Sequence, residues 1–185
     1  MIIREFNNEL WGRTPDQNTL YVIGMSGSGK STYANKRNNY MTYVIHLDSY
    51  FDCPEGVHCE VFDKYLSKVF PDYVKISYPI DKIDISEWGK LVMVFEKELL
   101  NFAAICYGKR RRVIVEGVQL LDDTLYPDKK FFSDKPVVLC DADIITAIRR
   151  RNKRDNKRLH INDFKNAMQW QKEIEKFLND AGFKR

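Results

Sequence analysis

The sequence predicts an α/β domain in which a parallel β-sheet of four to five strands is flanked by helices. Four short apolar runs lack the polar alternation of a half-exposed strand: Thr19–Gly24, Tyr43–Leu47, Val113–Glu116 and Val137–Cys140. A helical pattern follows each of them, and strands buried on both faces with helical crossovers are typical of parallel sheets. A chain of 185 residues with this pattern is expected to form a single domain, residues 1–185.

The helices are recognised by apolar residues that recur at intervals of three and four positions. We expect helices over Lys30–Asn38, Glu60–Val69, Ser86–Tyr107, Asp143–Lys157 and Asn162–Asp180. The first 18 residues and the final AGFKR are assigned to no element. Turn residues surround the Glu60–Val69 helix, so the interval 52–85 is expected to form an insertion above the sheet.

Composition narrows the class of protein. The chain is 44% hydrophobic and 30% charged, as in ordinary globular domains. No apolar run reaches the roughly 18 residues that span a bilayer, and the N-terminus lacks a signal-peptide core. The four cysteines include no CxxC pair. We therefore expect a cytoplasmic protein with no membrane partner.

The net charge of +4 is unevenly distributed. The window Arg149–Arg158 holds seven basic residues and one Asp, so it carries +6 while the rest of the chain carries −2. This pattern indicates one local cationic element on the helix that follows the last strand. It does not indicate a generally basic nucleic-acid-binding protein.

The glycine-rich stretch GMSGSGKST follows the first apolar run and opens a helix. Gly24, Gly29, Lys30 and Ser31 satisfy the Walker A pattern G-x-x-x-x-G-K-[ST] in the strand–loop–helix setting that it requires. Glycines let backbone N–H groups point at phosphate oxygens, Lys30 would reach the β- and γ-phosphates, and the Ser31 hydroxyl would contact Mg²⁺. A dinucleotide-binding loop has no use for this lysine and serine. The predicted residues that bind ATP or another NTP are Gly24, Ser26, Gly27, Ser28, Gly29, Lys30, Ser31 and Thr32.

Three further segments, HLDSYF, VIVEGVQLL and DADIITAIRRRNKRD, follow the Walker A loop, beginning at residues 46, 113 and 141. In this order the four segments, across about residues 19–158, resemble P-loop kinases similar to uridine kinase and its relatives among the nucleoside and nucleotide kinases. The resemblance implies a P-loop NTPase fold, a lid over about residues 149–158, and acceptor recognition within 52–85. It implies Mg²⁺- and ATP-dependent phosphoryl transfer to a hydroxyl of a small, nucleoside-like acceptor.

Two acidic residues end strands at the sheet edge that carries the Walker A loop. Asp48 could orient an acceptor hydroxyl and receive its proton, a catalytic role that the resemblance implies, or it could cap the turn that follows. Glu116 ends a buried strand, where a carboxylate is costly without a compensating cation. The resemblance places it near Mg²⁺, reached through water, and the alternative is a turn or capping carboxylate.

The basic helix offers Arg150 and Arg154, which lie four residues apart on one face, and Arg158 extends this face if the helix continues. A lid of this kind can stabilise charge on a transferring phosphoryl group, so both arginines are candidate catalytic residues. The alternatives are a solvated basic helix or a nucleic-acid surface. Asp141 and Asp143 are expected to cap this helix.

Other polar residues are interpreted as structural. His46 lies within a predicted strand and is expected to be a core histidine, and Lys109–Arg112 is expected to be a solvated loop. Two alternative functions stay open: a kinase for a polynucleotide or another large acceptor, and a nucleotide-dependent switch or nucleic-acid-binding module without acceptor phosphorylation. Nucleic acid is thus a less favoured partner than a small-molecule acceptor.

Overall fold

A computed structural model describes the chain except for residues 52–55, 71–84, 124–125 and 184–185, together with the side chains of 85–89 and 91. Most of the predicted insertion over 52–85 therefore lies outside the described residues. Its described part includes α3, Glu60–Val69, which has the predicted bounds.

The sheet has five strands in the order β1-β5-β2-β4-β3. Their bounds are Ile2–Phe6 for β1, Thr19–Ile23 for β2, Thr42–His46 for β3, Arg112–Glu116 for β4 and Val137–Asp141 for β5. Strands β2, β3, β4 and β5 are mutually parallel, as predicted. β1 pairs with β5 in the antiparallel direction, so the sheet is mixed and the prediction of a wholly parallel sheet is wrong at this edge.

Six α-helices are described besides short 3-10 turns. They are α1 (Lys30–Asn35), α2 (Leu47–Phe51), α3, α4 (Ile85–Gly108), α5 (Ile144–Arg154) and α6 (Ile161–Asp180). α2 falls where the sequence predicts only a strand end and a turn. None of the described helices is both long and apolar enough to cross a membrane.

α5 ends at Arg154, before the predicted Lys157, because the residues that follow Arg154 form a helix-terminating turn. Asn156 adopts a left-handed φ of 51°, and the N–H of Lys157 donates to the carbonyl of Asn152 over 2.8 Å. These features form a Schellman-type helix end, which asparagine tolerates better than most residues. Arg158 therefore lies outside the helix and does not extend the face of Arg150 and Arg154.

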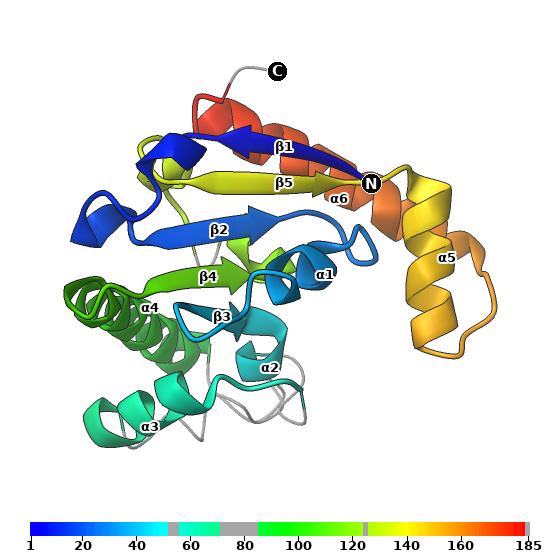
Figure 1. The fold of residues 1–185 in the computed structure, drawn as a ribbon. Coiled ribbons are helices and arrows are strands. Elements are labelled where there is room, and N and C mark those ends of the chain that lie inside the picture. Colours follow the sequence, from blue (N-terminus) through cyan, green and yellow to red (C-terminus); the bar gives the residue numbers. More distant parts are fainter. Residues whose placement is uncertain (52–55, 71–84, 124–125, 184–185) are drawn as a thin grey trace.

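The sheet lies between two layers of helices (Figure 1). Every residue of β2 is buried, as expected for a central strand. On one face Leu20 and Val22 pack with Tyr33 and Ala34 of α1. On the other face Tyr21 and Ile23 belong to a larger core, built with residues of α3, α4 and α6.

This topology assembles one end of the sheet. The carboxyl ends of the four parallel strands share an edge, and the glycine loop, Asp48, Glu116 and the start of α5 follow them there. Because β1 is antiparallel, it begins at this same edge, and the N-terminus lies near the start of α5 (Figure 1).

One acidic side chain of α4 packs among apolar groups below that edge. Glu96 lines a small apolar pocket with Leu47, Phe51, Val92, Phe95 and Tyr126. Burial raises the pKa of Glu96 to about 7, although the charge of Lys129 opposes the rise. The folded protein therefore holds a proton at Glu96 between about pH 4.5 and 7 that the unfolded chain releases.

The protonation of Glu96 leads to a prediction about the free energy of unfolding. As pH rises through this window the unfolded state is favoured, so Glu96 should lower the free energy of unfolding progressively up to about pH 7. Glu96→Gln should remove this loss, be more stable than wild type at pH 8 and differ least at pH 5. Urea unfolding across this pH range measures it. Glu9→Gln, which changes an exposed residue of the 3-10 turn Asn8–Leu10, is the control, and a pH dependence unaltered by Glu96→Gln would contradict the prediction.

Candidate functional site

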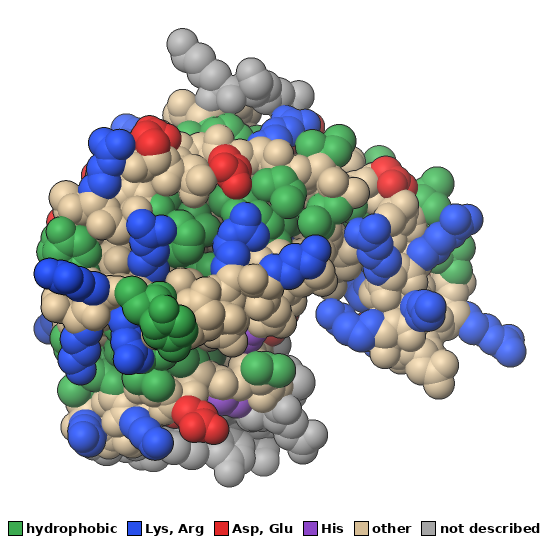
Figure 2. Space-filling view, in the orientation of Figure 1, with side chains coloured by type: hydrophobic (Ala, Val, Ile, Leu, Met, Phe, Trp, Pro, Cys, Tyr) green, Lys and Arg blue, Asp and Glu red, His purple; other side chains and the backbone are tan. Residues whose placement is uncertain are grey.

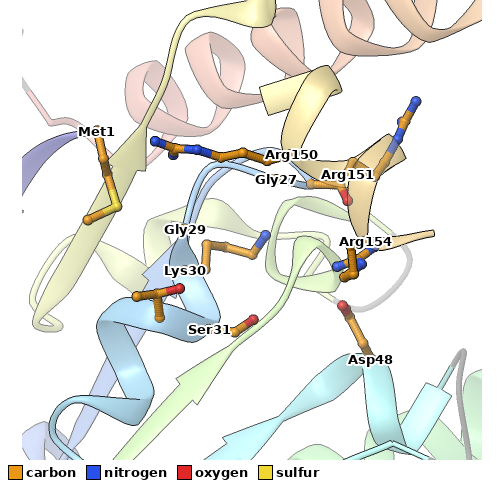
Figure 3. A pocket seen from close by; sticks show the side chains of 11 residues that line it. Met1, Gly27, Gly29, Lys30, Ser31, Asp48, Arg150, Arg151 and Arg154 are labelled. Atoms are coloured by element: carbon orange, nitrogen blue, oxygen red, sulfur yellow. The ribbon is translucent and has the colours of Figure 1, made fainter. Parts of the chain in front are cut away.

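A cavity of about 430 Å³ opens at the carboxyl edge of the parallel strands (Figure 3). Its lining residues are Met1, Ser26, Gly27, Gly29, Lys30, Ser31, Thr32, Asp48, Arg150, Arg151 and Arg154. Most predicted site residues therefore meet in one place, although they come from three separate parts of the chain. Gly24, Ser28 and Glu116 do not line the cavity.

The glycine loop packs against β5 and against α5, the helix that carries the arginines. Gly24 and Gly27 both have positive φ values, of 149° and 83°. A Cβ atom at Gly27 would collide with the backbone carbonyl of Ala147 in α5, and one at Gly24 with the carbonyl of Cys140 in β5. Only glycine fits so close an approach, so the position of the glycine loop relative to α5 is fixed.

Lys30 is the buried cation of this loop. Its side chain is only 6% exposed, and its Nζ donates to the carbonyl of Met25 over 3.2 Å. Burial lowers the pKa of Lys30, while the charges of Glu116 and Asp48 oppose the change. An ammonium group held among bare loop backbone is suited to an anionic ligand.

Behind the loop, Glu116 is the centre of a buried hydrogen-bonded chain. Ser31 Oγ donates to Glu116 Oε1 over 2.9 Å, and His46 Nδ1 lies 2.5 Å from the same oxygen. His46 Nε2 lies 3.1 Å from Asn35 Oδ1. Burial raises the pKa of Glu116, but the bond from His46, the charge of Lys30 and the bond from Ser31 together bring it below its ordinary value. The carboxylate is therefore ionised at neutral pH.

His46 is buried, as expected of a core residue, but it also orients Glu116. This second role was not predicted. It follows from the parallel register of β3 and β4, which places His46 directly beside Glu116. The strand order that makes them neighbours is not evident from a single sequence.

The carboxylate oxygens at this edge of the sheet fit the coordination of a magnesium ion. Glu116 Oε2 and Asp48 Oδ1 are buried and have no hydrogen-bond partner among the described residues. An unsatisfied carboxylate oxygen is costly, and a hydrated cation would satisfy it. Within the described part of the chain no three His, Cys, Asp or Glu side chains gather as a metal cage. Magnesium does not need one, because it is usually bound by one or two protein groups with phosphates and water.

Asp48 lies in the first turn of α2, beyond the end of β3, and not at the strand terminus itself. Its carboxylate points into the cavity on the side of Arg154 (Figure 3). The Oδ1 atom caps no turn among the described residues, which weighs against the capping interpretation.

The arginines of α5 divide into two groups. Arg150 and Arg154 reach toward the cavity, Arg150 on the side of Met1 and Arg154 on the side of Asp48 (Figure 3). Arg154 Nε also donates to Asp155 Oδ1 over 2.7 Å. Arg151 forms an ion pair with Asp163 of α6, so it has a structural partner.

The two predicted helix caps differ. Asp143 is the N-cap of α5, and its Oδ1 accepts from the N–H of Thr146 over 2.9 Å, as predicted. Asp141 was expected to cap the same helix, but it belongs to β5 and forms an ion pair with Arg4. The helix begins three residues after Asp141, too far for a capping bond.

Asp163 fastens α5 to α6 and was not predicted as a site-supporting residue. Besides the ion pair with Arg151, it accepts from Asn152 Nδ2 and from the N–H of His160, both over 2.9 Å. Asn152 is 5% exposed and also donates to the carbonyl of Arg158. The capping-box spacing of His160 and Asp163 is readable from sequence, but the tertiary bonds to α5 are not.

No protein-family model matches this chain, and no curated protein is significantly similar to it. The geometry of the cavity is therefore the basis for any assignment.

Asp163 leads to a prediction about the basic helix. Asp163→Asn removes the charge that Arg151 pairs with and weakens the link between α5 and α6. We expect the connection between the two helices to be cleaved by trypsin severalfold faster, because local opening is easier. Asp180→Asn at the other end of α6 is the control, and equal cleavage rates in the two variants would contradict the prediction.

Proposed function

We propose that the protein is a P-loop kinase that transfers the γ-phosphoryl group of ATP, or of another NTP, to a hydroxyl of a small, nucleoside-like molecule. One observation carries the proposal: a single cavity unites Lys30 of the glycine loop, Asp48 of α2, and Arg150 and Arg154 of α5. A cation in a phosphate-binding loop, a carboxylate and two further cations are the groups that phosphoryl transfer to a hydroxyl requires.

The residues would divide the work as follows. The glycine loop and Lys30 hold the β- and γ-phosphates. When bound with the nucleotide, Mg²⁺ neutralises phosphate charge, and Ser31 with Glu116 would hold it, Glu116 through water. Asp48 accepts the hydroxyl proton as the acceptor oxygen forms its bond to phosphorus and the bond to the leaving ADP oxygen breaks. Arg150 and Arg154 stabilise the charge on the phosphoryl group in transit.

The arrangement gives the cavity a direction. Asp48 lies on one side of Lys30 and Met1 on the other (Figure 3). Because the proton acceptor must be next to the attacking hydroxyl, the acceptor belongs on the Asp48 side and the rest of the nucleotide on the Met1 side. A cavity of about 430 Å³ suits a small acceptor better than a polymer.

The alternatives are less well supported by the same residues. A nucleotide switch has no need of an acceptor carboxylate at Asp48. A nucleic-acid surface on α5 needs free positive charge, but Arg151 pairs with Asp163 of α6. This pair reduces the charge that the window Arg149–Arg158 offers to a polyanion.

Asp48 provides the principal test. Incubation with Mg-ATP and a panel of nucleosides, nucleotides, sugars and oligonucleotides should reveal one acceptor class that stimulates ADP formation and gains the mass of one phosphate. Asp48→Asn should bind nucleotide nearly as wild type and lose transfer by about 10²-fold or more, because the proton acceptor is gone. Lys30→Ala should lose most of its nucleotide binding and most of its phosphoryl transfer.

The control is Asp16→Asn, an exposed carboxylate of the 3-10 turn Pro15–Gln17. ATP hydrolysis that no acceptor stimulates would favour the switch. Full turnover in a folded Lys30→Ala protein would reject the phosphate-loop assignment.

Arg154 provides a second test. An arginine that acts on charge developed during transfer affects the rate more than nucleotide affinity. Arg154→Ala should therefore lower kcat by at least about tenfold with little change in nucleotide affinity. Arg149→Ala is the matched control, since Arg149 is exposed on the same helix and does not line the cavity. Equal losses in both variants would show that only the general charge of α5 matters.

A further inference from the structure

A second cavity lies at the opposite end of the sheet, where α4 ends and β4 begins. Its volume is about 450 Å³, and its lining residues are Gly12, Asn18, Tyr107, Gly108, Arg110, Arg111 and Arg112. We call it the arginine cavity. Lys and Arg side chains gather at this end of the molecule, on the left in Figure 2. Of the solvated loop expected over Lys109–Arg112, Arg110 and Arg111 line this cavity, whereas Arg112, which also lines it, is the first residue of β4.

The three arginines of this cavity differ from the arginines that form ion pairs. Arg4, Arg151 and Arg154 each form an ion pair with an aspartate. Within the described ranges, by contrast, no carboxylate pairs with Arg110, Arg111 or Arg112, and no acidic side chain lines the cavity. Three uncompensated guanidinium groups around one hollow form a strong local positive potential.

Aromatic rings hold two of these groups in place. The guanidinium carbon of Arg112 lies 4.9 Å from the ring centroid of Trp11, and that of Arg111 lies 5.3 Å from the centroid of Tyr43. Arg111 also donates to the Tyr43 hydroxyl. Stacking on a ring orients a guanidinium plane without using its N–H donors, so most donors of Arg112 stay available to a ligand.

The walls are also fixed. Asn18 is 1% exposed, and its Nδ2 donates to the carbonyls of Ala103 and Arg111 over 2.8 and 2.9 Å. The Tyr107 hydroxyl donates to the carbonyl of Arg13 over 2.9 Å. These bonds join the N-terminal segment to α4 and to the start of β4, so the backbone that carries the arginines is fixed before a ligand binds.

The end of α4 accounts for only part of this arrangement. Arg110 has a left-handed φ of 56°, and the N–H of Arg111 donates to the carbonyl of Cys106 over 2.8 Å, which forms a Schellman-type helix end. Cations there are favoured by the last carbonyls of the helix. Glycine is the usual residue at the left-handed position, however, and Arg112 belongs to β4, beyond the reach of this effect.

We propose that the arginine cavity is a second anion site, which binds phosphate groups. Planar guanidinium groups bind phosphate oxygens through paired N–H donors, and several of them facing one hollow suit a phosphate ester or diphosphate. The phosphate could belong to a small phosphorylated compound or to a nucleic-acid backbone. The proposal is independent of the proposed kinase function, because the two cavities share no lining residue and lie at opposite ends of the sheet.

The test uses one probe for each source: inorganic pyrophosphate, and a short fluorescent single-stranded oligonucleotide, both at low salt. Binding is measured for Lys30→Ala and for Lys30→Ala combined with Arg110→Gln and Arg112→Gln, so that the first cavity contributes little. Loss of the two arginines should weaken binding of at least one probe by about tenfold or more, because charge-assisted hydrogen bonds to phosphate are lost. Loss confined to pyrophosphate indicates a small ligand, and loss with the oligonucleotide indicates a nucleic-acid backbone.

The matched control is Lys165→Gln with Lys172→Gln, which removes the same charge from exposed positions of α6. Arg110→Gln alone leaves the ring contact of Arg112 intact, so it tests the site even if the double variant unfolds. The conservative pair Arg110→Lys and Arg112→Lys should recover only part of the affinity, because lysine cannot form paired bonds. The proposal is overturned if neither probe binds, if the arginine variants bind as well as their parent, or if the lysine control loses as much.

Discussion

The buried carboxylate of Glu116 is the interaction on which the candidate site depends. An ionised group at 2% exposure is tolerated only if the surrounding groups compensate its charge. Here the compensation comes from Ser31, His46 and Lys30, which lie on α1 and β3. One carboxylate on β4 therefore links the start of α1 to the end of β3, and its charge acts on the buried Lys30 ammonium group, which lines the cavity.

The loop is constrained from the other side by α5. The contact between Gly27 and the Ala147 carbonyl leaves no room for a side chain, and Asp163 holds the far end of the same helix against α6. The arginines that face the cavity are thus carried by an element anchored at both ends.

The sequence was sufficient for features that depend on local pattern. The four parallel strands, α3 and the Asp143 cap follow from apolar runs, periodicity and capping chemistry, and each is found where it was expected. β1 was missed because four of its five residues are exposed, so it contains no buried run. Three other features depend on which segments become neighbours, and that information is not local. They are the bonds between Asp163 and α5, the His46–Glu116 contact and the position of Met1 in the cavity.

The antiparallel direction of β1 has a practical consequence for handling the protein. Met1 lines the cavity, whereas Phe6 at the other end of β1 stacks on Phe183 beyond α6, with ring centroids 4.6 Å apart. A purification tag fused ahead of Met1 would emerge at the mouth of the cavity and obstruct ligands in binding assays. Phe183 lies at the opposite end of that strand, away from the cavity, so the choice of fusion end decides whether a tag competes with ligands for access to the cavity.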